Sequence, residues 1–559
     1  MSYFDISGAT FNDQLRKFET SDPGHADVFN AAFAQLIQND VSLRNAASIF
    51  AKSKNEQALF LLNLRRTGKR YGVHFDEFSV SPLSAGTRLL DAVGKEAKPS
   101  TNTVRGVNDF EGESVFYGLE VNGHVDDSGE FIVEYIKGID NEFSRETKDV
   151  YILYLTQYIE MKVDANGESI ILSDERYPGT FPEGAAIRTD GTVRPFVVIA
   201  KYMAWDDESG IAHSHTGKTV THNQSHNGMI TRFRKKGTQY CGTTAQDKAH
   251  LDNLFQVAFA TRNTQSVMQG CTSYYSQYKA TIQENDVERI IIAKSQANSL
   301  VVGSVVSIGN ATVLSNENPN IDRGQEGMHA KANRVLITKI EDYDGSNSAV
   351  YVDNGGIKFN TSNTMIDDVI SPTYISTMPW RTGSCDNVLG SCGSPTNNTS
   401  GKEPYILFGI EMFLGFYEVI SNVILKIANH IMTPYICYDC TKLATSVTGD
   451  YIAVGYHVAN TGASWKYISK LGYDPENPCV RHGIEVNASS STGYADGQYT
   501  EDLEKASDGT REWLSGGDLY NGASSGRWYA FLSFGLGSSW WGCAARLSAS
   551  GRCAQKAAA

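Results

Sequence analysis

Apolar residues recur at helical spacing only near the start of the chain. Asp22-Pro23 combines an N-cap with a proline at the first helical position, and the apolar residues that follow lie three and four positions apart. Asp40 begins a second stretch of this kind, which ends near Gly68. Two short amphipathic helices bury too little apolar surface to be stable alone. We therefore expect residues 1–69 to form a helical stem that packs on the next domain or, as the preferred state, joins copies of itself in a homotrimer.

Beyond this stem, and as far as about residue 180, the hydrophobic period changes to two. Apolar alternation at residues 116–121 and 131–135 flanks a polar turn, and residues 150–163 form a further strand segment ahead of a second turn. The Asn166-Gly167 pair that follows is a strong signal for a β-hairpin. These patterns predict a small β-rich shoulder domain over residues 70–185.

From about residue 190 the chain is rich in glycine, serine, threonine and asparagine, with short apolar runs between them. The most apolar stretch, residues 406–427, contains three charged side chains and two glycines. Charges at that spacing are costly in a bilayer, so this stretch predicts consecutive buried strands and no membrane insertion. The sequence as a whole predicts an α+β, mostly β protein, with a large C-terminal domain over residues 190–559.

Composition narrows the function classes. The 559 residues include 63 acidic and 49 basic side chains, for a net charge of −14. Phosphate repulsion makes such a chain a poor general binder of nucleic acid. The first residues show neither a basic start nor a long apolar run, so we expect synthesis in a cytoplasm. The nine cysteines, an odd number, are expected there as reduced thiols.

Residues 511–553 differ from the rest of the chain. Four of the seven tryptophans fall here, and no Lys, Glu, Gln or Met occurs from Trp513 to Ala554. Protein surfaces normally carry about a quarter charged residues, so this segment is either buried or specialised for contact. Its tyrosine, tryptophan, serine, glycine, asparagine and arginine are the residues that dominate antibody paratopes, where rigid aromatic anchors alternate with adaptable small polar groups.

A regular framework runs through this segment: Arg511-Glu512-Trp513-Leu514, Gly517-Asp518-Leu519, Gly522-Ala523-Ser524, Gly526, Trp528, Gly535-Leu536, Trp541, Arg546-Leu547-Ser548-Ala549 and Gly551-Arg552. The framework resembles the variable proteins of diversity-generating retroelements, a group that includes phage tropism determinants. Residues 237–241, 266–271 and 409–412 look like tail-fibre versions of the same domain from gut phages, so the resemblance covers about two-thirds of the chain. The N-terminal helices are similar to the start of such fibres more weakly.

In that family, unfaithful copying of template adenines turns asparagine codons into a restricted residue set that excludes Lys, Glu, Gln and Met. The resemblance implies that the diversified, receptor-binding positions lie between framework residues, at Gly516, Tyr520, Asn521, Arg527, Tyr529, Phe531, Ser533, Phe534, Ser538, Trp540, Gly542 and Cys543. Trp540 departs from this rule, because changes at adenines alone cannot produce tryptophan from asparagine. Trp540 is therefore either a framework residue or a chance match to the pattern of variable positions.

The aromatic residues of the segment divide into two expected groups. Trp513, Trp528 and Trp541 are expected in the core of the domain. Tyr520, Tyr529 and Phe534, which lie beside glycines and serines, are expected to contact a ligand.

The resemblance implies a C-type-lectin (formylglycine-generating-enzyme-like) fold and a bacteriophage virion adhesin, a tail or head fibre. Its C-terminal surface would bind a bacterial surface protein or glycan at the host cell, and its N-terminal helices would contact other virion proteins. No enzymatic activity is expected, since the sequence contains no GxSxG, HExxH, P-loop or Rossmann motif. Two alternatives stay open: a virion-associated enzyme that degrades surface glycan, and a non-variable structural or capsid-decorating fibre.

Histidine and cysteine clusters elsewhere in the chain are candidates for metal or redox sites. Four histidines lie within 14 residues, at His213, His215, His222 and His226, where imidazoles at such spacing can bind zinc or iron. The polar loop around them favours a solvated segment instead. Cys437 and Cys440 have CxxC spacing, but no second pair completes a zinc site.

Acidic turns raise the question of calcium. Residues 206–208, 341–345 and 367–368 are acidic but lack EF-hand spacing. No cofactor and no metal are therefore expected, with calcium or another metal as the alternative. Cys543 and Cys553 lie in the region where formylglycine-generating enzymes have their copper-binding cysteines, but the spacing between the two residues differs from that motif.

Overall fold

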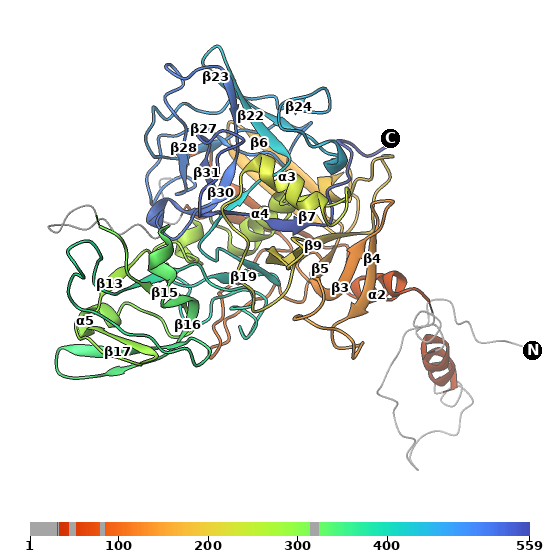
Figure 1. Cartoon of the computed structure of the whole chain (residues 1–559). Helices are drawn as coiled ribbons and strands as arrows, with labels where there is room; N and C mark the ends of the chain where they lie inside the picture. Colours follow the sequence, from red (N-terminus) through yellow and green to blue (C-terminus); the bar gives the residue numbers. More distant parts are fainter. Residues whose placement is uncertain (1–30, 32, 44–51, 79–83, 314–323, 559) are drawn as a thin grey trace, which may run out of the picture.

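The computed structural model describes residues 31, 33–43, 52–78, 84–313 and 324–558. It is mostly β, with several sheets and few helices, so the predicted fold class is confirmed (Figure 1). None of the helices in the described ranges is long and apolar enough to cross a membrane.

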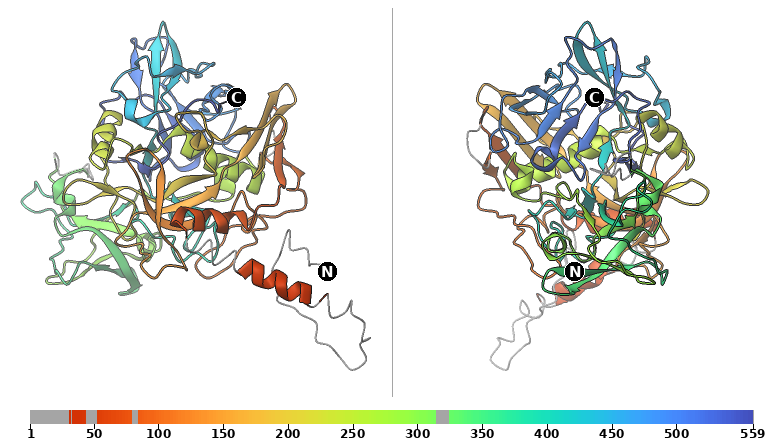
Figure 2. Two further views of the ribbon diagram at one scale, coloured as in Figure 1. Left: turned by 90° about the vertical axis from the view of Figure 1, so that its right-hand side faces the viewer. Right: turned by 60° about the vertical axis from the view of Figure 1, so that its left-hand side comes forward.

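The N-terminal helices differ from the expected pair. Residues 33–43 are helical without a break at Asp40, and this helix lies apart from the body of the molecule (Figures 1 and 2). The expected start at Asp22-Pro23 lies outside the described residues. The apolar side chains Phe33, Leu36 and Leu43 are exposed, which leaves an uncovered stripe on this helix.

The second helix, α2 (Lys54–Asn63), belongs to the body rather than to a stem. It begins at Ser53, whose side chain forms a capping box with Glu56. Its Ala58 and Leu62 are buried in the same core cluster as strand β4 (Phe131–Ile136). The helix near residues 54–63 is therefore not part of a separate stem, in contrast to the boundary expected at residue 69.

A six-stranded sheet joins the expected shoulder to the C-terminal region, and we call it the shared sheet. Its order is β12 (Cys241–Gly242), β33 (Arg546–Ser548), β9 (Phe196–Met203), β5 (Val150–Leu155), β3 (Leu119–Val125) and β4. β5 pairs antiparallel with β9, Tyr151 opposite Ala200. Because this pairing crosses the expected boundary between residues 185 and 190, that boundary does not separate two cores.

Every residue of β5 and β9 is buried, so both faces of the shared sheet are covered. Ile152 and Tyr154 belong to one core cluster, together with helix α4 (Ala245–Phe259). Tyr151 and Leu153 belong to another, together with α2 and α3 (His226–Arg234).

The predicted hairpins form, with one correction. β3 and β4 pair around a turn at Gly129, and β6 (Tyr158–Asp164) pairs with β7 (Gly167–Ser173) through Asn166-Gly167. The segment at residues 150–163, however, is two strands in different sheets, β5 and β6. The polar pair Thr156-Gln157 lies between the two strands and marks the break.

The remaining elements form smaller sheets and short helices. One five-stranded sheet has the order β2 (Thr87–Leu90), β1 (Arg70–Phe75), β7, β6, β8 (Phe181–Pro182). A six-stranded sheet has the order β13 (Gln277–Lys279), β18 (Tyr374–Met378), β15 (Val305–Gly309), β16 (Ala332–Asp342), β17 (Asn347–Asp353), β14 (Arg289–Ala293). The two-stranded sheets are β10 (Trp205–Asp206) with β11 (Ala212–His213), β19 (Tyr405–Leu407) with β20 (Ile410–Met412), and β26 (Lys470–Leu471) with β27 (Gly483–Glu485). Short helices are α5 (Lys294–Ala297), η1 (Gly184–Ala186), η2 (Thr264–Ser266), η3 (Glu326–His329), η4 (Cys440–Lys442) and η5 (Gly522–Ser524).

Two further sheets carry the C-terminal segment. One has the order β25 (Lys466–Tyr467), β28 (Gly497–Tyr499), β31 (Gly526–Phe531), β30 (Leu514–Gly516), β21 (Tyr417–Val419), β32 (Cys543–Ala544). The other has the order β24 (Ile452–Ala453), β23 (Ile431–Ile436), β22 (Val423–Ala428), β29 (Gly509–Arg511). The apolar stretch 406–427 thus forms consecutive strands, β19 to β22, as predicted.

Candidate functional site

Residues 511–553 form part of the protein interior as well as part of its surface. They supply strands to three sheets, through β29 to β33. Trp513 and Trp528 are buried, as expected, and the Trp513 ring lies 4.2 Å from the ring of His482. Trp541 is only partly buried, so one of the three predicted core tryptophans reaches the surface.

Five of the twelve expected receptor-binding positions lie inside the molecule: Gly516, Arg527, Tyr529, Gly542 and Cys543. Residues buried in this way offer almost no surface to a receptor, so the fold does not support a contact role at these positions. At position 516 the backbone conformation favours glycine, because residues with a Cβ atom rarely adopt a φ of 92°.

Arg527 is a structural cation rather than a contact residue. Its guanidinium is 2.5 Å from Asp252 Oδ1, and its side chain is 2% exposed. Asp252 also accepts a hydrogen bond from Lys248 of α4. A buried charge of this kind is stable only when it is paired, so Arg527 anchors β31 to α4.

Tyr529 lies beneath other aromatic rings. Its ring stacks on Tyr417 at 5.8 Å and on Trp465 at 4.9 Å, and it is fully buried. Its hydroxyl hydrogen-bonds the hydroxyl of Tyr417 at 3.3 Å. Cys543 lies in the strand next to Tyr417 and is likewise fully buried.

The other seven expected positions reach solvent to different degrees. Tyr520 is 73% exposed, and the remaining six are half-buried: Asn521, Phe531, Ser533, Phe534, Ser538 and Trp540. Asn521 also shapes the loop, since its Oδ1 accepts the backbone N–H of Asp518. These seven positions are the part of the expected set that the fold leaves accessible.

The accessible aromatics belong to one continuous group of rings, which we call the aromatic band: Tyr275, Tyr417, Trp465, Tyr499, Tyr520, Tyr529, Phe531, Phe534, Trp540 and Trp541. Successive centroids lie 4.9–6.4 Å apart from Tyr520 through Tyr275, Trp541 and Trp540 to Tyr417. From there the contacts continue through Phe531. These separations are typical of favourable aromatic pairs.

Four members of the aromatic band come from outside the C-terminal segment: Tyr275, Tyr417, Trp465 and Tyr499. Tyr275 and Trp465 are exposed. Their place in the band could not be predicted from the pattern of residues 511–553, because all four lie elsewhere in the sequence. A signal was present at Trp465, which follows Thr-Gly-Ala-Ser and so has the same small polar neighbours as Tyr520.

A groove of about 400 Å³ lies beside the tryptophan end of the aromatic band. Its lining includes Trp540, Trp541, His222, His329 and Arg334. Burial lowers the pKa of His222 to about 4, so its imidazole is neutral at pH 7. Among the described residues that line this groove there is no carboxylate. Aromatic, neutral and basic groups therefore surround it.

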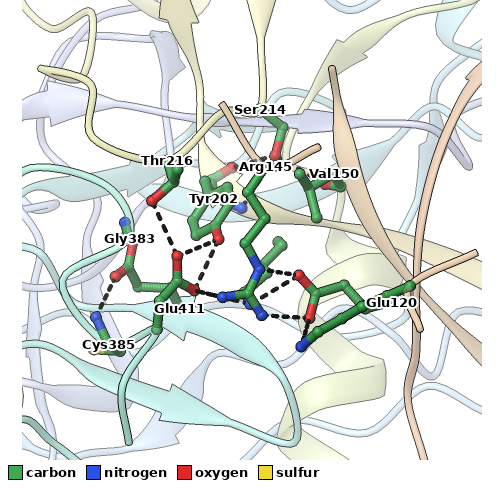
Figure 3. A network of polar contacts seen from close by, with 12 residues as sticks. Glu120, Arg145, Val150, Tyr202, Ser214, Thr216, Gly383, Cys385 and Glu411 are labelled. Carbon is green, nitrogen blue, oxygen red and sulfur yellow. Dashed lines mark hydrogen bonds and ion pairs between the residues drawn. The ribbon is translucent and has the colours of Figure 1, made fainter. Parts of the chain in front are cut away.

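A separate set of polar and charged side chains, most of them buried, forms what we call the ionic network: Glu120, Arg145, Lys201, Tyr202 and Asp386 (Figure 3 labels Glu120, Arg145 and Tyr202). Lys201 Nζ lies 3.1 Å from Glu120 Oε1 and 2.9 Å from Asp386 Oδ1. Burial raises the pKa of Glu120, but the Arg145 hydrogen bond and the Lys201 charge hold it at about 2. The network joins β3 and β9 to the loop that follows β18.

Of the four clustered histidines, the structure brings only His213 and His215 together, and both meet Asp149. His222 stacks on Phe416 at 5.8 Å, and His226 is buried at the start of α3. No other group of three metal-ligating side chains occurs among the described residues, so neither the Cys437-Cys440 pair nor the acidic turns form one.

All nine cysteines are free and buried. Burial raises the pKa of Cys437 to about 12, which makes its thiol a weak nucleophile at neutral pH.

No protein-family model matches the sequence, and a search of curated proteins finds no significant match.

Proposed function

We propose that the chain is a bacteriophage virion adhesin that binds a bacterial surface protein or glycan through the aromatic band. The observation that supports this most is the band itself, in which exposed Tyr520, Tyr275 and Trp465 lie on a layer of packed rings. Exposed aromatic groups of this extent are typical of binding surfaces. Rings held by other rings lose little conformational entropy when they bind.

The proposal extends to the lectin-type fold and to diversification by the retroelement mechanism, both of which rest on the resemblance. Diversification is proposed for six of the seven accessible positions, at 520, 521, 531, 533, 534 and 538. Trp540 is proposed only as a contact residue, because changes at adenines alone do not produce tryptophan from asparagine. A near-copy of the coding region for residues 511–553 beside a reverse-transcriptase gene, differing mainly at adenines, supports this part. Without such a copy, the diversification proposal fails while the adhesin proposal stands.

Trimerisation and attachment to other virion proteins are proposed for the N-terminal helix at residues 33–43. Its exposed Phe33, Leu36 and Leu43 form an apolar stripe that self-association would cover. Three linked binding surfaces add avidity of about 10²–10⁴ over one surface. A trimer therefore suits a site whose single-copy affinity is weak.

The experiment measures binding of the labelled full-length chain to a panel of intact bacterial strains. We expect at least one strain to bind it, and the double variant Tyr520→Ala/Phe534→Ala to reduce that binding by about tenfold or more, as for hot-spot aromatics. Tyr343→Ala is the matched control, because Tyr343 is an exposed tyrosine outside the aromatic band. Full binding by the double variant would place the receptor site elsewhere. Release of sugar from host polysaccharide would instead favour a glycan-degrading enzyme.

A further inference from the structure

Asp149, His213 and His215 come together from separate parts of the chain. Asp149 immediately precedes β5, and His213 ends β11. His215 follows two positions later, which places it on the same side of an extended chain. One possible ligand atom from each residue lies within 4.8 Å of the other two, and no other such group occurs in the part of the chain that the structure describes.

The spacing of these atoms suits a small divalent ion. Asp149 Oδ1 is 3.2 Å from His213 Nδ1 and 3.5 Å from His215 Nε2. Zinc bonds of 2.0–2.1 Å in a tetrahedron require ligand atoms about 3.4 Å apart. Both distances therefore match edges of a zinc coordination tetrahedron.

His215 adds an independent observation. Its side chain is nine-tenths buried, and its Nε2 makes no hydrogen bond. A buried polar atom without a partner is costly, and this one faces the Asp149 carboxylate.

The neighbours of these residues hold them in ligating orientations. The Ser214 backbone N–H donates to Asp149 Oδ1 at 2.7 Å. On the other side of the His213 ring, Asp207 Oδ2 lies 3.5 Å from Nε2. A carboxylate on the distal nitrogen of a ligating histidine fixes its tautomer and increases its basicity, as around protein-bound zinc.

We propose that Asp149 Oδ1, His213 Nδ1 and His215 Nε2 bind a divalent transition-metal ion of the zinc type, with Asp207 as the supporting carboxylate. Imidazole and carboxylate ligands suit zinc and its neighbours better than calcium, which prefers six or more oxygens. Three protein ligands leave a fourth position of the tetrahedron for water. The site is separate from the aromatic band and does not depend on the adhesin proposal.

Lys236 is the competitor of the metal. Its Nζ lies 2.6 Å from Asp149 Oδ2 and 3.5 Å from His213 Nδ1. An ammonium so close to the bound cation repels it, so Lys236 lowers the metal affinity and balances the Asp149 charge when metal is absent. Removal of this ammonium is therefore expected to strengthen metal binding, an effect opposite to that of removing a ligand.

The test titrates the full-length chain with Zn²⁺ by calorimetry, and with Co²⁺ by visible absorption, which reports four-coordinate geometry. We expect one ion per chain, at least tenfold weaker binding for His215→Ala, and about tenfold weaker binding for Asp207→Asn. We expect Lys236→Met to bind at least about tenfold more tightly, a gain that unfolding cannot produce. Circular dichroism checks that each variant is folded.

His124→Ala is the matched control. His124 also pairs with a carboxylate, that of Glu134 on the surface, but it does not belong to a group of three potential metal ligands. Its Zn²⁺ affinity should equal that of the unchanged chain. The proposal is overturned by a dissociation constant weaker than about 1 mM for both ions. It is also overturned if His215→Ala leaves the affinity unchanged, or if Lys236→Met weakens it.

Discussion

The aromatic band and the ionic network differ in two ways: how far their side chains are exposed to solvent, and how far one contact depends on another. In the ionic network, Lys201 is 3% exposed and contacts both Glu120 and Asp386, so each charge depends on the others. In the aromatic band, Tyr520 is 73% exposed and its ring packs against that of Tyr275. Loss of one partner in a buried charge network leaves the remaining charges unbalanced. Loss of one exposed ring removes one contact.

This difference indicates which substitutions the fold tolerates. An edge-to-face ring pair contributes about 0.5–1.5 kcal/mol beyond the area it buries, and exposed rings bury little. The outer part of the aromatic band can therefore vary in sequence at low cost to stability, while the ionic network cannot. Such a separation is what a diversifiable binding surface requires.

Lys201→Met is expected to have the largest effect. The substitution keeps the length of the side chain but leaves Glu120 and Asp386 without the ammonium between them. Removal of one partner from a buried ion pair costs about 3–5 kcal/mol. Urea denaturation followed by circular dichroism measures the loss. A loss below about 1 kcal/mol, the range of surface salt bridges, would remove the contrast between the two regions.

Glu411, a buried carboxylic acid near Asp386 of the ionic network, makes the stability of this region depend on pH. Its carboxylate accepts the backbone N–H groups of Gly383 and Cys385, both at 2.9 Å (Figure 3). Burial and the nearby Asp386 charge raise its pKa from 4.5 to about 7. Between pH 4.5 and 7 the folded chain keeps a proton that the unfolded chain has released, so unfolding releases it. Stability therefore falls as pH rises through this window.

The expected fall between pH 4.5 and 8 is about 3 kcal/mol from this group, at 1.36 kcal/mol for each pKa unit. Glu411→Gln imitates the protonated acid, so the variant should lose this slope and exceed the unchanged chain in stability at pH 8. Glu512, whose pKa burial raises to about 8, titrates in both proteins and cancels in the difference. Identical slopes for the variant and the unchanged chain would show that Glu411 does not titrate here.

Local sequence patterns predicted the secondary structure better than they predicted which side chains are buried. Turns such as Asn166-Gly167 were correct because a left-handed backbone position is a local property, and Gly167 has a φ of 126°. The shared sheet could not be predicted, because β33 joins β9 across more than 300 residues of sequence. The contact of Asp149 with His213 is non-local for the same reason.

The same limit explains the five buried candidates. Tyr529 and Phe531 lie on the same side of β31, since they are two positions apart, yet only Phe531 reaches solvent. Trp465, from a distant loop, covers Tyr529 at 4.9 Å. No pattern within residues 511–553 contains that information. The resemblance offered candidate positions along the chain, but it contained no information on which of them the rest of the fold covers.

Tyr520→Ala is expected to have the smallest effect on stability. With 73% of its surface exposed, Tyr520 contributes mainly its contact with Tyr275, so unfolding free energy should change by no more than about 0.5 kcal/mol. The matched substitution nine residues later, Tyr529→Ala, removes a fully buried ring and should cost about 3 kcal/mol or more. Urea denaturation of both variants compares the stability lost at an exposed tyrosine with that lost at a buried one. Equal losses would mean that the outer rings support the fold as much as the inner ones, and the aromatic band could then not vary without unfolding the domain.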